Sequence, residues 1–90
     1  MLNLARIQAR MSQLNNWNLD GEMIAKEFNF MSFKEAMEFV NDVAEIAEKA
    51  EHYPGMVIDG SLVRLSLTTH KERCLTDTDF DVAMEIDKVQ

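Results

Sequence analysis

Basic residues are the first thing that this sequence has in short supply. Nine lysines and arginines stand against sixteen aspartates and glutamates, which gives a net charge of −7 at pH 7. A protein that binds a nucleic-acid backbone presents a basic patch or stripe to the phosphates, and the sequence has no such cluster. We therefore expect no nucleic-acid partner.

Cysteine and long apolar segments are scarce as well. Cys74 is the only cysteine, so it has no partner for an internal disulfide and none at the spacing of a zinc site. We accordingly expect no bound metal. No apolar run reaches the roughly 18 residues of a membrane-spanning helix, and the N-terminus lacks the apolar segment and the small-residue cleavage site of a signal peptide. These absences predict a cytoplasmic protein without membrane association.

The length of the chain sets the domain organisation. Ninety residues, with no linker, repeat or low-complexity segment, predict one domain that spans residues 1–90. A chain this short buries only about two-thirds of the surface that it exposes when unfolded. We therefore expect it to gain stability by assembling with further copies of itself.

The first third of the chain predicts a helix followed by a β-hairpin. From Trp17 to Phe30, apolar and polar residues alternate on both sides of Asp20-Gly21, a favoured two-residue turn. Before this hairpin, apolar residues recur every three or four positions, the spacing of one helix face: Leu4, Ile7, Met11 and Leu14.

A long helix is predicted next. It begins at about Ser32, because Ser32 and Glu35 have the spacing of a capping box and Met31 can pack against Ala36 as a hydrophobic staple. It ends before Pro54, since the residue that precedes a proline is pushed out of helical geometry. The apolar stripe expected to face the core consists of Ala36, Met37, Val40, Val43, Ala44 and Ala47.

The last third predicts a second hairpin and a final helix. Residues 56–58 and 62–68 are β-like on either side of Asp59-Gly60, and Thr76 caps a helix with an apolar face of Phe80, Ala83, Ile86 and Val89. The element order is therefore α-β-β-α-β-β-α. It predicts an α+β fold with a four-stranded antiparallel sheet and three helices packed on one face.

Both histidines lie in one stretch, between Glu48 and Asp79. His52 follows the long helix and His70 follows the last strand, so folding the second hairpin brings them close together. Two imidazoles can act as acid and base near neutral pH. Simpler roles also remain open: His52 can favour the helix dipole at a helix C-terminus, His70 can be a surface-loop histidine, and Asp79 can complete the cap that starts at Thr76.

Several motifs together resemble the pterin-4a-carbinolamine dehydratase family. They are Glu48-x-x-x-His52-Tyr53-Pro54, Thr69-His70 and Leu75-Thr76-x-x-Asp79, with Trp17 and Phe28-x-Phe30-x-x-Phe33 before them. The resemblance covers nearly the whole chain and includes the order of the helices and strands.

This resemblance implies an enzyme that converts 4a-hydroxytetrahydropterin to quinonoid dihydropterin and water, in the recycling of tetrahydrobiopterin, without a metal or organic cofactor. By position, it implies that His52 and His70 are the catalytic acid–base histidines and that Asp79 is the acidic residue beside them. It further implies a homodimer or homotetramer. The positions that match contacts with the pterin substrate are Glu51, Tyr53, Thr68, Thr69 and Lys71.

The sequence departs from the family pattern at three positions. Tyr53 stands where a second histidine is usual, Gly60 where an aromatic residue is usual, and Cys74 where glycine is common. A tyrosine can stack or hydrogen-bond, but with an ordinary pKa of about 10 it does not supply the same base at neutral pH.

Two alternatives to the dehydratase stay open. One is a pterin-binding protein without turnover, which Tyr53 favours. The other is a noncatalytic dimerisation or assembly module of the same fold, a second role known for the family. Phe39 and Ile46 flank the apolar stripe of the long helix and widen it, which suggests contact with a helix of another subunit.

Overall fold

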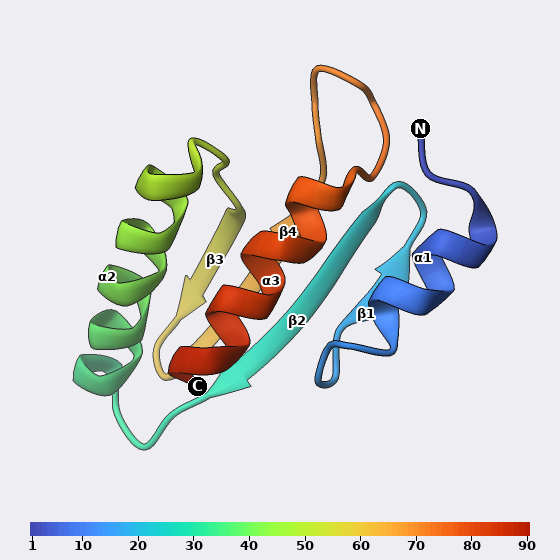
Figure 1. Ribbon diagram of the computed structural model, residues 1–90. Helices are drawn as coiled ribbons and strands as arrows, with labels where there is room; N and C mark the ends of the chain where they lie inside the picture. Colours follow the sequence, from blue (N-terminus) through green and yellow to red (C-terminus); the bar gives the residue numbers. More distant parts are fainter.

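The computed structural model, which describes residues 1–90, has three helices and an antiparallel sheet, and the helices lie on one face of the sheet (Figure 1). The strands lie in the order β1-β2-β4-β3. The predicted α+β fold and its element order are confirmed. None of the three helices combines the length and the apolar composition that crossing a membrane requires. In chain order the elements are α1 (Leu4–Met11), β1 (Asn18–Asp20), β2 (Met23–Asn29), α2 (Phe33–Ala50), β3 (Gly55–Asp59), β4 (Leu62–Leu67) and α3 (Asp77–Val89).

Both hairpin turns lie one residue later than predicted. Asp20 pairs with Met23, and Asp59 pairs with Leu62, so the two-residue loops are 21–22 and 60–61. Each loop has a positive φ only at its glycine, +61° at the first and +58° at the second. A type II′ turn requires this conformation of its first residue and favours glycine there. The aspartates therefore end the strands instead of forming the turns.

Ser32 caps the N-terminus of α2 as predicted, but the capping box is only half formed, because Glu35 binds the N–H of Met31 and not that of Ser32. Ser32 Oγ accepts the N–H of Glu35 at 3.1 Å, and the Glu35 carboxylate accepts the N–H of Met31 at 3.0 Å. The predicted hydrophobic staple is wrong, because the Met31 side chain is 91% exposed. The hydrogen bond from the Glu35 N–H to Ser32 and the one from the Met31 N–H to Glu35 are therefore what fixes the start of this helix.

The buried face of α2 is rotated away from the predicted stripe. Ala44 is exposed, and the buried residues are Ala36, Phe39, Val43 and Ala47. Phe39 packs on Phe28 in β2 and on Phe30 just after it. Its ring centroid lies 4.6 Å from that of Phe28 and 5.1 Å from that of Phe30. A phenylalanine removes far more apolar area from water than an alanine does. Phe39 thus belongs to the core, and its predicted contact with another subunit is wrong.

The core lies between the sheet and the helices. Ile24, Val63, Leu65 and Leu67 project from β2 and β4, and the fully buried Phe80 projects from α3. Figure 1 shows α3 lying across the face of these central strands. The strict alternation of β4, in which every second residue is buried, is the pattern of a sheet with one face against a core.

Lys26 is a charged residue on this apolar face, and α3 supplies its partner. Asp87 Oδ1 accepts hydrogen bonds from Lys26 Nζ at 3.0 Å and from Trp17 Nε1 at 2.9 Å. The N–H of Asn15 donates to Asp87 Oδ2 at 3.0 Å. A buried charge is tolerated only when it is paired and hydrogen-bonded, and this cluster meets that condition while joining α3 to the segment before β1.

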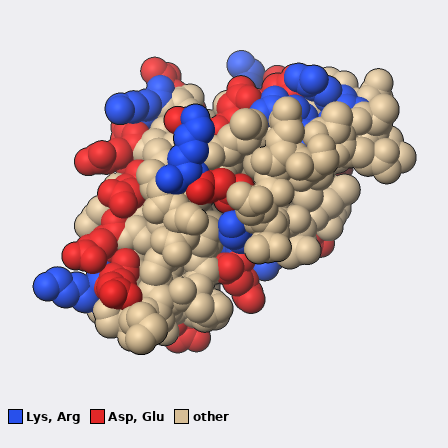
Figure 2. Space-filling view, turned by 60° about the horizontal axis from the view of Figure 1, so that its bottom comes forward, with Lys and Arg blue, Asp and Glu red and all other residues tan.

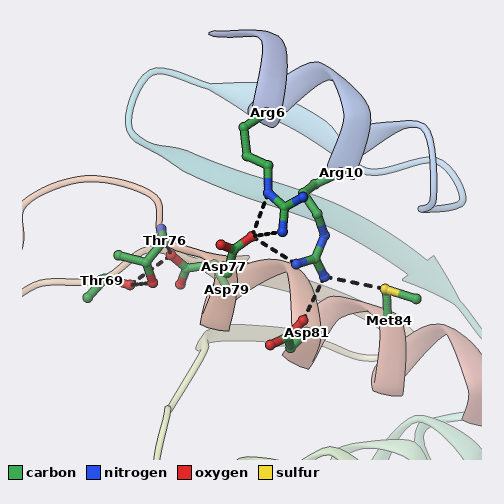
Figure 3. A network of polar contacts seen from close by, with 8 residues as sticks. All are labelled: Arg6, Arg10, Thr69, Thr76, Asp77, Asp79, Asp81 and Met84. Carbon is green, nitrogen blue, oxygen red and sulfur yellow. Dashed lines mark hydrogen bonds and ion pairs between the residues drawn. The ribbon is translucent and has the colours of Figure 1, made fainter. Parts of the chain in front are cut away.

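Two arginines fasten α1 to the first turns of α3 (Figure 3). Arg10 donates from Nη1 to Asp77 Oδ1 at 2.9 Å and from Nη2 to Asp81 Oδ1 at 2.7 Å. Its guanidinium carbon lies 5.5 Å from the centre of the Phe80 ring, and its side chain is only 9% exposed. Arg6, which is 52% exposed, adds a second hydrogen bond to Asp77 at 3.1 Å.

This cluster shifts the pKa of two of its members. Burial acts to lower the pKa of Arg10, but the hydrogen bonds and charges of Asp81 and Asp77 outweigh burial and raise it overall. Burial likewise acts to raise the pKa of Asp77, and the hydrogen bonds and charges of Arg10 and Arg6 outweigh it, so this pKa lies below its ordinary value of 3.8. Both shifts favour the ionised forms, which keeps the two helices paired.

We expect Arg10→Met to lower the free energy of unfolding by about 2 kcal/mol, because hydrogen bonds between charged groups are lost in a buried position while the apolar stem is kept. The matched change Arg6→Met, at an exposed position, should cost less than about 1 kcal/mol. Urea unfolding at neutral pH measures both. Equal losses for the two variants would show that burial of Arg10 does not matter.

The Asp77 pKa also predicts a pH dependence. Because the folded pKa lies below the unfolded value of 3.8, this carboxylate stabilises the fold above that value, and the contribution is lost as the pH falls through the folded pKa. The difference in unfolding free energy between the wild type and Asp77→Asn should therefore be largest near neutral pH and shrink below about pH 4. Urea unfolding at neutral pH and below about pH 4 measures this difference. If it is the same at both, the pKa of Asp77 is not lowered in the folded protein.

Candidate active site

The C-terminus of α2 directs the chain toward the end of the sheet. The N–H of His52 donates to the carbonyl of Ala47 at 3.1 Å, and the N–H of Glu51 donates to that of Glu48 at 3.3 Å. These two bonds make a Schellman motif, in which the residue after the helix adopts the left-handed conformation and is usually glycine. Here that residue is Glu51, with φ +51°. His52 therefore lies just beyond the helix, on a backbone held by the helix end.

Asp79 lies in the first turn of α3 and is fully buried, with 0% of its surface exposed. Its Oδ2 accepts the N–H of Thr76, the residue that caps the helix, at 2.9 Å. This bond is the carboxylate half of a capping box. The capping role considered from the sequence is thus present, and it leaves the other carboxylate oxygen free for a different partner.

That partner is His52. Its Nε2 lies 2.5 Å from Asp79 Oδ1, and its side chain is 15% exposed. An ionised carboxylate only accepts hydrogen bonds, so Nε2 carries the proton in this pair. Nδ1 has no hydrogen-bond partner in the chain. Arg10 Nε is the one buried side-chain nitrogen or oxygen without a partner, so Nδ1 is not buried. The pair therefore leaves Nδ1 open to the surface.

Thr69 connects this pair to the loop that carries the second histidine (Figure 3). Its hydroxyl lies 2.8 Å from Asp79 Oδ2 and 2.8 Å from the hydroxyl of Thr76. Its N–H donates to the carbonyl of Cys74 at 3.2 Å, which closes the loop of residues 70–73. The sequence predicted Thr69 as a substrate contact, and the structure places its hydroxyl on Asp79.

His70 and Lys71 are exposed on this closed loop. The carbonyl of His70 accepts the N–H of Arg73 at 3.2 Å, and Arg73 has a positive φ of +54°. The His70 ring makes no hydrogen bond with the rest of the chain, whereas His52 is held by Asp79. Because Thr69 precedes His70 and shares Asp79 with His52, both histidine segments lie at the same end of the sheet.

The other predicted contact residues surround this end. Glu51 is exposed, and Tyr53 is 58% exposed. Thr68 donates its hydroxyl to the carbonyl of Glu22 at 2.6 Å, which ties the end of β4 to the first hairpin. The structure thus joins His52, Thr69 and Asp79 by direct hydrogen bonds and leaves the remaining candidates accessible around them.

A groove on the surface runs between α2 and α3. Its volume is about 600 Å³, and none of the predicted site residues lines it. Figure 2 shows acidic side chains along the edge formed by α2, at the left of that view. Ile46, Ala50, Val82 and Val89 provide the apolar part of the groove, and Asp42, Glu45, Asp81 and Glu85 provide carboxylates.

Comparison with known sequences gives a consistent result. Residues 1–89 match the family model described as "Pterin 4 alpha carbinolamine dehydratase". Similar proteins named "Putative pterin-4-alpha-carbinolamine dehydratase" occur in Roseiflexus castenholzii, at 43% identity over 99% of this chain and 96% of the relative. Another in Trichormus variabilis is 40% identical over the same shares of the two chains, and one in Sulfolobus acidocaldarius is 33% identical over 93% and 92%.

Two solved structures are similar in fold. A "transcriptional coactivator/pterin dehydratase from Brucella Melitensis" superimposes with a TM-score of 0.92 at 29% identity, covering 98% of this chain and 96% of the other. A "pterin dehydratase-like protein" described as "a RuBisCO assembly factor in the alpha-carboxysome" gives a TM-score of 0.72 at 20% identity, over 86% and 92%. The second likeness concerns the fold alone.

We expect Asp79→Asn to lower the free energy of unfolding by about 3 kcal/mol, because a buried carboxylate that accepts three hydrogen bonds is replaced by an amide whose nitrogen accepts none. Asp42→Asn, at an exposed position of α2, should change it by less than about 0.5 kcal/mol. Urea unfolding measures both. If the two substitutions have the same effect, the hydrogen bonds to Asp79 contribute nothing to stability.

Proposed function

The chain belongs to the pterin 4 alpha carbinolamine dehydratase family, and we propose that it dehydrates a 4a-hydroxytetrahydropterin by acid–base catalysis with His52 and His70. The observation that carries this proposal is the buried Asp79, which holds the His52 ring by one nitrogen and leaves the other open. The two simpler roles do not explain this pair. A carboxylate that only caps a helix requires no imidazole partner, and a histidine that only interacts with a helix dipole requires no buried carboxylate.

The proposed reaction is the loss of water across the C4a–N5 bond. One imidazole takes the proton from N5, and the N5–H electron pair forms the C4a=N5 double bond of the quinonoid dihydropterin. The C4a–O bond breaks as the second imidazole, in its protonated form, gives a proton to the departing hydroxyl. The products are the quinonoid dihydropterin and water. Oxidation states do not change, so the proposal includes no redox cofactor.

His52 and His70 differ in how firmly they are held. Asp79 fixes the orientation and the tautomer of His52, as a carboxylate does for the histidine of a hydrolase triad, and this assigns Nδ1 as the nitrogen that exchanges a proton with the pterin. His70 has no side-chain partner within the chain and is positioned through the backbone of its loop, which the bond between Thr69 and Cys74 closes. A bound pterin would supply the partner that His70 lacks.

The proposed substrate contacts lie around these two rings. Tyr53 presents an exposed aromatic ring directly after His52, which suits stacking against a flat bicyclic pterin. Glu51 and Lys71 add charged groups of opposite sign, and the main chain at Thr68 and Thr69 adds polar groups. The left-handed backbone at Glu51 is costly for a residue with a Cβ, and such conformations cluster at functional sites.

The proposal also extends to the setting of the enzyme. We place it in the cytoplasm as a homodimer or homotetramer that acts in tetrahydrobiopterin recycling, with a small-molecule pterin as its ligand and no metal. The net charge of −7 supports the absence of a nucleic-acid partner.

A noncatalytic binding or assembly module is the second candidate. The observation that favours it is the groove between α2 and α3, which has a volume of about 600 Å³ and is lined by neither histidine. The Brucella relative carries the description "transcriptional coactivator" beside that of a pterin dehydratase. A module of this kind would keep the fold without turning over a pterin.

We expect His70→Ala and His52→Ala each to lower the dehydration rate by about two orders of magnitude or more, as for the loss of a general acid–base group. The assay follows the breakdown of a 4a-carbinolamine that a pterin-dependent hydroxylase generates in place, corrected for the spontaneous reaction. Lys34→Ala, at an exposed site on α2, is the control and should match the wild type.

Two outcomes of this assay would contradict the proposal. Near-full activity of His70→Ala would remove the catalytic role of His70. No acceleration by the folded wild-type protein would remove the dehydratase and favour the assembly module.

A further inference from the structure

The direction of the hydrogen bonds around Asp79 can be worked out from the chemistry of the groups. The hydroxyl of Thr69 has one proton and two neighbours at 2.8 Å, Asp79 Oδ2 and the hydroxyl of Thr76. A carboxylate accepts and does not donate, so the Thr69 proton is directed to Asp79. Thr76 must then donate to Thr69. The result is a chain in which each hydroxyl donates to the next and Asp79 is the final acceptor.

All three groups that bind Asp79 are therefore donors, and they come from separate parts of the chain. His52 Nε2 binds Oδ1, whereas the Thr69 hydroxyl and the Thr76 N–H bind Oδ2. The carboxylate is fully buried, so water does not replace a missing donor. Hydrogen bonds in such a chain also polarise and strengthen one another. The two donors on Oδ2 thus fix the plane of the carboxylate that His52 meets through Oδ1.

We propose that Thr69 is a positioning residue of the acid–base site: its hydroxyl, held in turn by Thr76, orients Asp79 so that the His52 ring is kept with Nε2 protonated and Nδ1 toward the ligand. This inference rests on the proposed dehydratase function for its kinetic consequence. It assigns the Thr69 side chain to Asp79 instead of to the pterin.

The backbone of Thr69 extends this role to the second histidine. Its N–H donates to the Cys74 carbonyl at 3.2 Å, and its own carbonyl accepts the N–H of Glu72 at 3.1 Å. These bonds close the loop that begins with His70. One residue therefore connects the carboxylate that holds His52 with the loop that presents His70.

The test compares two changes at this position with one elsewhere. Thr69→Val keeps the shape of the side chain and removes the hydroxyl, and Thr69→Ser keeps the hydroxyl. Thr78→Val makes the same chemical change at an exposed position of α3 that has no part in the site. For each variant, kcat and KM are measured with the carbinolamine assay, and exchange of the His52 Nε2 proton with water is measured by nitrogen-edited proton NMR.

We expect Thr69→Val to lower kcat by roughly ten-fold with KM within about two-fold, as for the loss of an outer partner that orients a functional side chain. The Nε2 proton should exchange roughly ten-fold faster, because its acceptor is no longer fixed. Thr69→Ser and Thr78→Val should stay within about two-fold of the wild type in both measurements.

Two results would overturn the inference. A raised KM with an unchanged kcat in Thr69→Val would mean that the hydroxyl contacts the substrate. Unchanged exchange of the Nε2 proton in Thr69→Val would mean that Thr69 does not act through Asp79. If the wild type does not accelerate dehydration, the dehydratase proposal fails, and the NMR measurement still decides the positioning role because it needs no turnover.

Discussion

A single buried carboxylate joins the parts of this structure that matter for its chemistry. Asp79 is fully enclosed and accepts hydrogen bonds from the end of α2, from the loop after β4 and from its own helix cap. Removing a charge from water is costly unless donors replace the lost hydration. The carboxylate therefore requires these three segments to meet at one point, and the positions of both histidine segments follow from that requirement.

Helical periodicity explains how α3 carries this carboxylate beside two others without conflict. At about 100° per residue, Asp77 and Asp81 lie only about 40° apart around the helix, whereas Asp79 lies on nearly the opposite side. The first two face α1 and pair with Arg10. Asp79 faces the sheet end and His52. Each negative charge in the first turns of α3 thus has a cationic or hydrogen-bonding partner, and the helix dipole favours acidic residues at this end.

Local rules were sufficient to predict most of the fold from the sequence. The cap at Ser32, the two glycine turns and the alternation of β4 depend on residues close together in the chain, and they were located to within one or two residues. The direction of the buried face of α2 was not predicted. Periodicity treats Ala44 and Phe39 as equally apolar, and only contact with the aromatic residues near β2 determines that Phe39 is the buried one. Packing between elements overrides the local pattern there.

The candidate site was likewise predicted only in part from the sequence. The segment that holds His52, His70 and Asp79 could be recognised in the sequence, and their catalytic roles stay predictions. The hydroxyl chain from Thr76 through Thr69 was missed, since it depends on side-chain directions after a loop closes. The pairing of α1 with α3 had a detectable signal: Arg6 and Arg10 are four residues apart, as are Asp77 and Asp81, so each pair lies on one helix face.

The contact between α1 and α3 has a consequence for how the chain is made. Arg10 and Trp17 are synthesised early, yet their partners Asp77, Asp81 and Asp87 lie 67–71 residues later in the chain. On the ribosome the Arg10 guanidinium of α1 is unpaired, and the Trp17 indole beyond that helix lacks its hydrogen-bond acceptor, until α3 emerges. Contacts at such long separation form late and slow the search for the native state. The segment that contains Arg10 and Trp17 therefore completes its contacts only after α3 has been synthesised.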